Sequence, residues 1–302
     1  MGMTGSERLA YRLALLTGGA TLALILFGGL VTNTGAALAV PDWPTTFGYN
    51  MFLYPWSGMV GGIFFEHSHR LIGAVVGLLT LTLAAALWRT GSMLRTLGLV
   101  AVALVIAQGV VGGLRVVLVK ETLALVHGCL AQAFFGLIVA IALLASPGMT
   151  TVSRIAEPSL RVLTVLAAGL VYVQIVFGAL LTHGGRIDLH LAGAVAVFVF
   201  VPVVTARLRR SGDVVAAPFA RVLIIALGIQ LLLGAGTFLT RLSWIALPGG
   251  QLTVLVLPVA HRLMGSVILG AAVTLAVRAM ANRAAGAWEL AGELTPVTRP
   301  TS

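Results

Sequence analysis

The sequence contains few charged residues. Asp, Glu, Lys and Arg make up 9% of its 302 residues, whereas a soluble domain carries about a quarter of its residues as charged side chains. Hydrophobic residues make up 59% of the chain, and the mean hydropathy is +1.06. This composition excludes a soluble globular protein and indicates a protein of the lipid bilayer.

The sequence also leaves little room outside its apolar runs. A helix needs about 20 apolar residues to cross a bilayer, and eight runs reach this length, at about residues 11–32, 65–88, 95–116, 122–145, 161–182, 188–207, 219–240 and 252–281. The first run is long enough to span, and no small-residue cleavage site stands out beyond it, so we interpret it as a helix rather than a cleavable signal peptide. We therefore predict an all-α membrane protein with eight transmembrane helices.

Acidic residues are scarce, with 9 Asp and Glu against 19 Lys and Arg, which gives a net charge of +10. The basic residues stand at the ends of the apolar runs and form no patch of the kind that binds nucleic acid, so we expect no nucleic-acid partner. Most lie at the termini or in the connections after the second, fourth and sixth runs; those towards the opposite face are Arg70, Arg115, Lys120, Arg186, Arg241 and Arg262. The positive-inside rule then predicts a multi-pass protein of the cell membrane with both termini in the cytoplasm.

Cysteine is almost absent. The single residue, Cys129, excludes an intrachain disulfide, so the cysteine content does not indicate the redox compartment. Beside an apolar run, it is interpreted as a small core residue rather than a reactive thiol.

The chain divides into two halves of four helices each. The polar segment Ser146–Ser159, which contains Pro147 and Pro158, suits a connection between helices. Two internal echoes support related halves, since repeated bundles are common in membrane proteins. One matches residues 69–73 (His-Arg-Leu-Ile-Gly) with residues 261–265 (His-Arg-Leu-Met-Gly), and the other places a glutamine four residues before a glycine in the third, fifth and seventh helices. We predict an N-terminal bundle at residues 1–147 and a C-terminal bundle at residues 148–302.

Four histidines occupy matching positions, one towards the outer end of each even-numbered helix: His69, His127, His190 and His261. Even-numbered helices run in the same direction, so the four imidazoles lie in one layer near one membrane face. An ionisable residue inside a membrane helix is costly and favours a function, although a lone histidine could equally be a hydrogen-bonded core residue.

The residue four positions after each histidine, on the same helical face, is small: Gly73, Ala131, Ala194 and Gly265. A flat macrocycle could approach the backbone there, although close helix packing explains the same residues. Imidazole is an axial ligand of haem iron, whereas zinc gathers more protein ligands around one ion. We predict two bis-histidine haem sites, one formed by His69 and His127 and the other by His190 and His261.

A carboxylate accompanies only one of these sites. Glu66 stands three residues before His69, and the corresponding part of the eighth helix carries Leu257 and Pro258. This asymmetry indicates chemistry at the first site, where a buried carboxyl group could transfer protons. The alternative is an interfacial charge that faces water or pairs with Arg70.

Arg70 and Arg262 directly follow ligand candidates, and the planar guanidinium suits carboxylates. Haem propionates and lipid phosphates are both suitable partners. His67 and His183 fall outside the histidine layer and are interpreted as solvated or structural residues.

The longest connection, from Thr34 to about Gly62, contains Pro41-Asp42-Trp43-Pro44 and Tyr54-Pro55-Trp56. Trp and Tyr collect at the membrane interface. The segment is therefore either a lid over a site or an interfacial loop without substrate contact.

The sequence resembles the haem A synthases over nearly all eight spans. The resemblance rests on the Gly28-Gly29-Leu30-Val31 run, the Pro-Asp-Trp-Pro loop, residues 66–73 (Glu-His-Ser-His-Arg-Leu-Ile-Gly) and the later histidines. The resemblance implies two four-helix bundles related by pseudo-twofold symmetry. It also implies an oxidoreductase that converts a methyl substituent of haem O to a formyl group by successive hydroxylation, giving haem A for terminal oxidases.

Carried over to this sequence, the resemblance makes His190 and His261 the ligands of a resident haem b. His69 and His127 would bind the substrate or product haem, with Glu66 as the catalytic carboxylate. Haem O synthase and an unidentified electron acceptor are the implied partners. Many family members have a cysteine pair in the outer loop, but this chain has Val40 before the Pro-Asp-Trp-Pro stretch, so an outer disulfide or thiol step is absent.

Two other classes fit bound haem without converting it. A cytochrome b-like quinone oxidoreductase typically has two histidines about a dozen residues apart on one helix, whereas each helix here has one near the same face. A transporter or haem-handling chaperone would show gating features such as broken helices at mid-membrane, which the sequence does not indicate.

Overall fold

The computed structural model describes residues 5–146, 158–214 and 216–293. Within these residues lie eight α-helices: α1 (Gly5–Asn33), α2 (Gly61–Leu87), α3 (Ser92–Leu118), α4 (Glu121–Leu144), α5 (Pro158–Gly184), α6 (Ile187–Arg210), α7 (Ala216–Leu242) and α8 (Gly250–Glu293). Each contains an apolar window long enough to cross a membrane. The prediction of eight spanning helices is confirmed. Helices are the natural outcome for these runs because lipid offers no partner for an unpaired backbone group.

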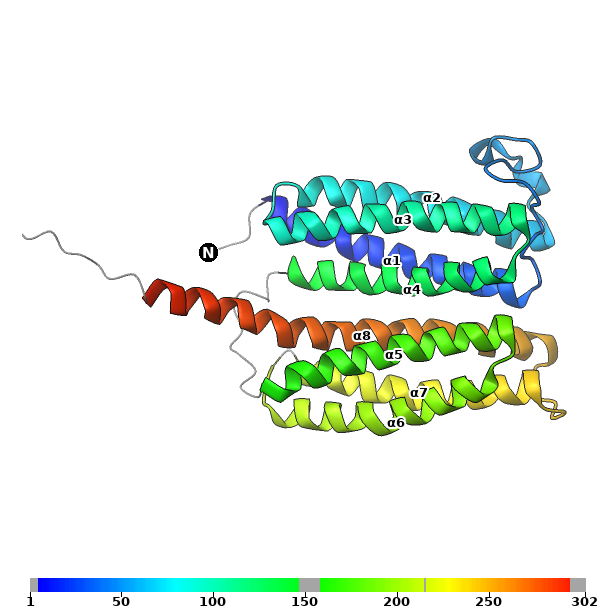
Figure 1. Cartoon of the computed structure of the whole chain (residues 1–302). Coiled ribbons are helices and arrows are strands. Elements are labelled where there is room, and N and C mark those ends of the chain that lie inside the picture. Colours follow the sequence, from blue (N-terminus) through cyan, green and yellow to red (C-terminus); the bar gives the residue numbers. More distant parts are fainter. Residues whose placement is uncertain (1–4, 147–157, 215, 294–302) are drawn as a thin grey trace, which may run out of the picture.

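The helices form two layers of four (Figure 1). In the first, α1 packs on α2 and α4, and α3 packs on α2 and α4; α5 to α8 repeat the same cycle of neighbours. Each group encloses its own apolar core, with Val76, Leu83 and Ile138 buried in the first and Val201 and Leu223 buried in the second. The predicted boundary at residue 147 lies outside the described residues.

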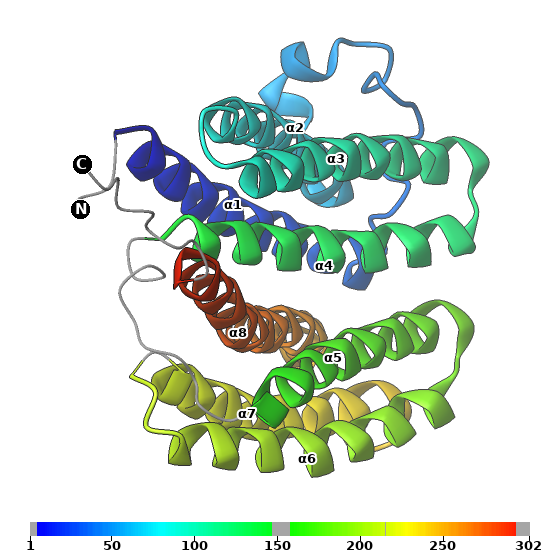
Figure 2. The same ribbon diagram turned by 60° about the vertical axis from the view of Figure 1, so that its left-hand side comes forward.

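The two bundles meet through four helices. α4 packs on α8, α1 packs on α8, and α4 packs on α5, so α8 lies between α4 and α5 (Figure 2). This set of contacts is symmetric if α1 corresponds to α5 and α4 corresponds to α8. The contact of α1 with α8 is then equivalent to that of α5 with α4, and the contact of α4 with α8 is equivalent to itself. The packing therefore makes α2 the counterpart of α6, although the motif at residues 69–73 of α2 recurs in α8.

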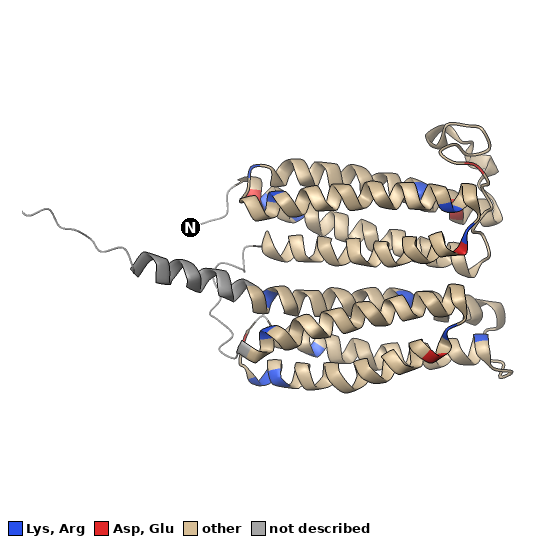
Figure 3. Cartoon of the chain, viewed as in Figure 1, with Lys and Arg blue, Asp and Glu red and all other residues tan. Residues whose placement is uncertain are grey.

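Charged residues lie mostly towards the two ends of the helices (Figure 3). One buried ion pair joins α8 to the start of α7: Arg278 Nη2 lies 2.7 Å from Asp213 Oδ2. Asp213 Oδ1 also accepts a hydrogen bond from the backbone N–H of Ala216, at 2.7 Å. The carboxylate thus caps α7 and ties it to α8, and such pairing is what a buried charge requires.

Candidate functional site

The structure brings the four layered histidines together as two pairs. The ring centroids of His69 and His127 lie 6.2 Å apart with the ring planes at 76°, and those of His190 and His261 lie 6.1 Å apart at 75°. Each pair joins diagonally opposed helices of one bundle, α2 with α4 and α6 with α8, because only diagonal partners face each other across the bundle axis. The same geometry is therefore built twice.

Every one of these histidines lies against a glycine of the preceding odd-numbered helix. A Cβ atom placed on the glycine would meet the imidazole Cε1 at 3.0–3.4 Å, for Gly28 with His69, Gly112 with His127, Gly178 with His190 and Gly234 with His261. Such distances are tighter than ordinary van der Waals contact. A larger residue at Gly28, Gly112 or Gly234 would require the imidazole to shift by a few tenths of an ångström. Sequence reasoning did not connect these glycines with the histidines, although the recurring glutamine and glycine spacing was the available signal.

The glutamines of that spacing hold three of the four histidine segments. Nε2 of Gln108 donates to the backbone carbonyl of His127 at 3.1 Å, and Nε2 of Gln174 donates to the carbonyl of His190 at 3.0 Å. Nε2 of Gln230 lies 3.3 Å from the His261 ring nitrogen Nε2. In α1, the position four residues before Gly28 is Leu24, so His69 lacks this support.

The histidine pairs fit haem iron. A metal–nitrogen bond is about 2 Å long, and the ring centroid lies about 1.2 Å behind the nitrogen. Two imidazoles on opposite sides of one metal ion therefore have centroids about 6.4 Å apart, which is close to the separations in both pairs. The Nδ1 atoms of His69, His127 and His261 are buried without a hydrogen-bond partner among the described residues. In the same part of the chain, no three His, Cys, Asp or Glu side chains gather as a zinc site requires.

Glu66 is buried at the outer end of α2, with 4% of its surface exposed. Its Oε1 lies 2.9 Å from Arg70 Nη2, and its Oε2 accepts a hydrogen bond from the backbone N–H of Val40 at 3.0 Å. The carboxylate pairs with Arg70 but does not face water. Its counterpart by packing, three residues before His190, is Ile187, so the carboxylate remains specific to the first bundle.

Arg70 clamps the outer loop onto α2. Its Nη1 donates to the carbonyls of Asp42 and Thr45 at 2.7 and 3.0 Å, and its Nη2 donates to the carbonyl of Val40 at 2.8 Å. Both Nη atoms are thus engaged with the loop and Glu66. Arg262 differs, because the hydrogen bond described for it is one donated by Nη1 to Thr32 Oγ1 at 3.3 Å.

The clamped loop reaches over α3. The indole of Trp43 occupies the space that a Cβ on Gly113 would need, one residue beyond the glycine that contacts His127. Asp42 stabilises the following turn by accepting hydrogen bonds from the N–H groups of Phe47 and Gly48. Burial raises the pKa of Asp42, but these hydrogen bonds and that of Thr45 lower it further, to about 2. This placement favours the lid interpretation of the loop.

The remaining histidines have structural contacts. His67 is 1% exposed, with Nδ1 3.1 Å from Thr46 Oγ1 and its ring 5.2 Å from that of Tyr54. His183 Nδ1 lies 2.8 Å from Glu121 Oε2 and joins the end of α5 to the start of α4. The contact provides a partner for the Glu121 carboxylate, which stands where the connection between α3 and α4 ends.

Comparison with known proteins finds a family that matches part of the chain. Residues 58–187 match the family model COX15-CtaA, described as cytochrome oxidase assembly protein. The haem A synthase of Shouchella clausii (strain KSM-K16) is 34% identical over 110 residues, and the alignment spans 35% of this chain and 35% of that relative.

The family match includes Glu66, His69 and His127 and ends three residues before His190. It thus contains the whole of the first histidine pair, its carboxylate and part of the outer loop. Residues 58–187 are thus similar to the COX15-CtaA cytochrome oxidase assembly family, and the chain spans about a third of the length of the haem A synthase that it matches.

Proposed function

We propose that this protein is a haem A synthase, which oxidises a methyl group of haem O to a formyl group by successive hydroxylation and so supplies haem A to terminal oxidases. The observation that carries the proposal is the pair of matching histidine sites of which only one has a buried carboxylate beside it. A protein that merely carried electrons between two haems would have no need of this difference.

In this proposal, residues 1–147 form the substrate half. His69 and His127 bind haem O, and Gly28 and Gly112 leave room for their imidazole rings. The loop that Arg70 binds covers the site. Oxidation of a methyl group releases protons. Glu66, three residues from His69 on the same helical face, is the group proposed to accept them. Its Oε1 pairs with Arg70, and its Oε2 accepts one hydrogen bond from a backbone N–H.

Residues 148–302 form the resident-cofactor half. His190 and His261 would hold haem b, which would supply an electron-relay centre when bound. The glutamines hold these ligands in place, through the carbonyl of His190 and the ring of His261. Arg262, which directly follows His261, is a proposed propionate partner, and its Nη1 donates to Thr32 Oγ1 of α1 at 3.3 Å.

The protein acts, by this proposal, as a multi-pass protein of the cell membrane with both termini in the cytoplasm. Its substrate comes from a haem O synthase, and its electrons pass to an acceptor. The charge distribution at the helix ends supports the orientation.

The deciding experiment is co-expression with a haem O synthase in a host that makes no haem A, followed by extraction and chromatography of the pigments. We expect haem A or its hydroxylated precursor in addition to haem O. Haem O alone, with this protein present in the membrane and carrying haem, would exclude the enzyme and favour a haem carrier.

A further inference from the structure

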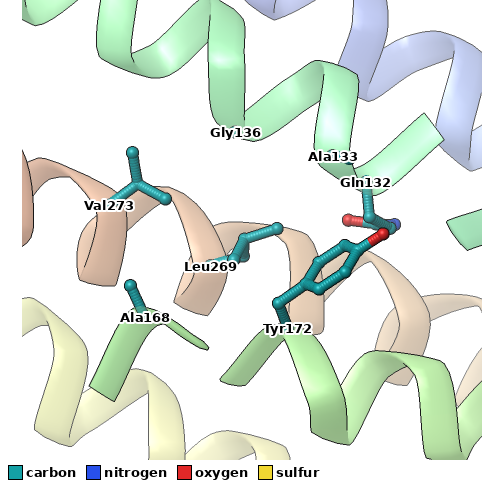
Figure 4. Close-up of a pocket in the computed structure, with 7 residues that line it drawn as sticks. All are labelled: Gln132, Ala133, Gly136, Ala168, Tyr172, Leu269 and Val273. Atoms are coloured by element: carbon teal, nitrogen blue, oxygen red, sulfur yellow. The ribbon is translucent and has the colours of Figure 1, made fainter. Parts of the chain in front are cut away.

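A cavity of 230 Å³ lies where the two bundles meet. It is lined by α4, α5 and α8, through Gln132, Ala133, Gly136, Ala168, Tyr172, Leu269 and Val273 (Figure 4). Ala133, Ala168, Tyr172 and Val273 are only partly buried, so the cavity is open to the surface of the helix bundle. It is separate from both histidine pairs, none of whose residues lines it.

The cavity is apolar except at one end. There the amide of Gln132 and the hydroxyl of Tyr172 point towards each other (Figure 4). Gln132 is 5% exposed, and its Oε1 is buried without a hydrogen-bond partner among the described residues. The Tyr172 hydroxyl donates to the carbonyl of Cys129 at 3.1 Å, so its hydrogen is already engaged.

An unpaired buried acceptor is costly, particularly in a membrane interior. Gln132 lies near the middle of α4 and Tyr172 near the middle of α5, at a depth where phospholipid head groups do not reach. A ligand that satisfies Gln132 Oε1 must therefore be soluble in the hydrocarbon layer and still carry an O–H donor.

The size of the cavity narrows the class further. A cavity of about 150 Å³ accommodates one benzene ring, and the larger ligand pockets of proteins occupy about 300–1,000 Å³. At 230 Å³, the space suits a single substituted six-membered ring and is too small for a haem.

We propose that this cavity binds the ring of a lipid-soluble quinol, with one quinol O–H donated to Gln132 Oε1 and the ring packed against Leu269 and Val273. The isoprenoid tail passes Ala168, one of the partly buried lining residues, towards the surface of the bundle. Gln132 lies five residues after His127, and Leu269 lies eight after His261, which places the ring roughly 7 to 12 Å along the helices from the two histidine pairs. The binding site rests on the cavity and its unpaired acceptor, and it does not depend on the proposed haem A synthesis.

The test uses the full-length protein in phospholipid nanodiscs with a photoreactive azidoquinone reduced to the quinol. After illumination, we expect cross-links to peptides of α4, α5 or α8 at the cavity, which excess short-chain quinol abolishes. Gln132→Leu should weaken binding roughly five- to tenfold through the lost hydrogen bond, and Ala168→Phe should block it by filling the cavity. Val165→Phe, on an exposed part of α5, is the matched control and should label normally.

A second measurement does not depend on any variant. The dimethyl ether of the same quinol has the ring and tail but lacks O–H donors, so it should compete at least five times less well than the quinol. Equal competition by the ether would overturn the proposal, as would cross-links confined to other surfaces or unchanged labelling of Ala168→Phe. The haem absorption of each variant shows that it has folded. Absence of haem A formation in the experiment above would leave these binding results unaffected.

Discussion

The two histidine pairs share one geometry but differ in what surrounds them. In the C-terminal bundle, Gln174 and Gln230 contact both members of the pair. In the N-terminal bundle, Gln108 supports His127, whereas Leu24 takes the corresponding place beside His69. Glutamine side chains thus contact both histidines of the C-terminal pair but only His127 of the N-terminal pair.

The difference extends to the outer face of the protein. α1 and α2 are joined by a long segment that includes η1 (Met51–Leu53) and η2 (Trp56–Gly58) and is fixed to Arg70 and Glu66, whereas only Gly185 and Arg186 separate α5 from α6. A site with a lid and a less firmly held ligand suits a group that enters and leaves. A site with two supported ligands suits a group that stays. The repeated frame positions the two histidine pairs, and the proposed difference in their roles rests on the departures from the repeat.

The largest effect is expected from removing the carboxylate that only one site has. Glu66→Ala should reduce conversion of haem O at least about 100-fold, the usual range for loss of a general acid or base, while bound haem remains. Haem A formation in the co-expression system and haem content of the purified protein measure the two quantities. Glu66→Gln keeps the shape of the side chain and should fail equally; full conversion by either variant would remove Glu66 from the mechanism.

Next in size is the loss of one ligand of the resident site. His190→Ala should lower haem b content about tenfold or more, because one axial bond is lost while the N-terminal pair is untouched. Haem content and the optical spectrum of the purified protein provide the measurement. His183→Ala, outside both pairs, is the control. Unchanged haem b in His190→Ala would show that the pairs are assigned to the wrong haems.

A smaller effect is expected from filling one glycine contact. In Gly112→Ala, the new Cβ would lie 3.0 Å from His127 Cε1 and displace the ring, and overpacking of this kind costs about 1–3 kcal/mol. We expect haem binding in the N-terminal bundle to weaken by roughly three- to tenfold in a titration with haem. Gly109→Ala on the same helix meets nothing within 4 Å and should bind normally. Equal affinities of the two variants would show that the contact is unimportant.

The smallest effect tests the comparison itself. Leu24→Gln restores the missing glutamine of the N-terminal pair, and one added hydrogen bond contributes about 1 kcal/mol. Haem should leave the N-terminal bundle about two- to fivefold more slowly, as measured by transfer to an excess of an apo-haem acceptor. The opposite change, Gln230→Leu, should speed release from the C-terminal bundle. Identical release rates would mean that glutamine support does not distinguish the pairs.

Local motifs were an incomplete guide to which helices correspond. The recurrence of His-Arg-Leu-x-Gly at residues 69 and 261 suggests that α2 and α8 are equivalent, yet α8 lies at the junction of the bundles and α2 does not. The two segments share a local sequence pattern, but which helices are structurally equivalent depends on how the helices pack. The prediction that only one histidine pair has a carboxylate nearby compared α2 with α8, where Leu257 is apolar. It also holds for α6, the counterpart by packing, because Ile187 is apolar too.

The sequence by itself determined the class of structure and the layer of histidines. Apolar runs of membrane-spanning length must become helices because lipid cannot satisfy a free backbone, and the alternation of direction places His69 and His261 near one face. These results depend on residues close together in the chain. The tertiary structure decided the rest: the glycine beside each imidazole, the Arg70 clamp on the loop and the cavity at Gln132. Each of these features joins residues from different helices, or from a helix and a distant loop. Such contacts depend on how the packed helices are rotated and how closely they approach, and hydrophobic periodicity specifies neither.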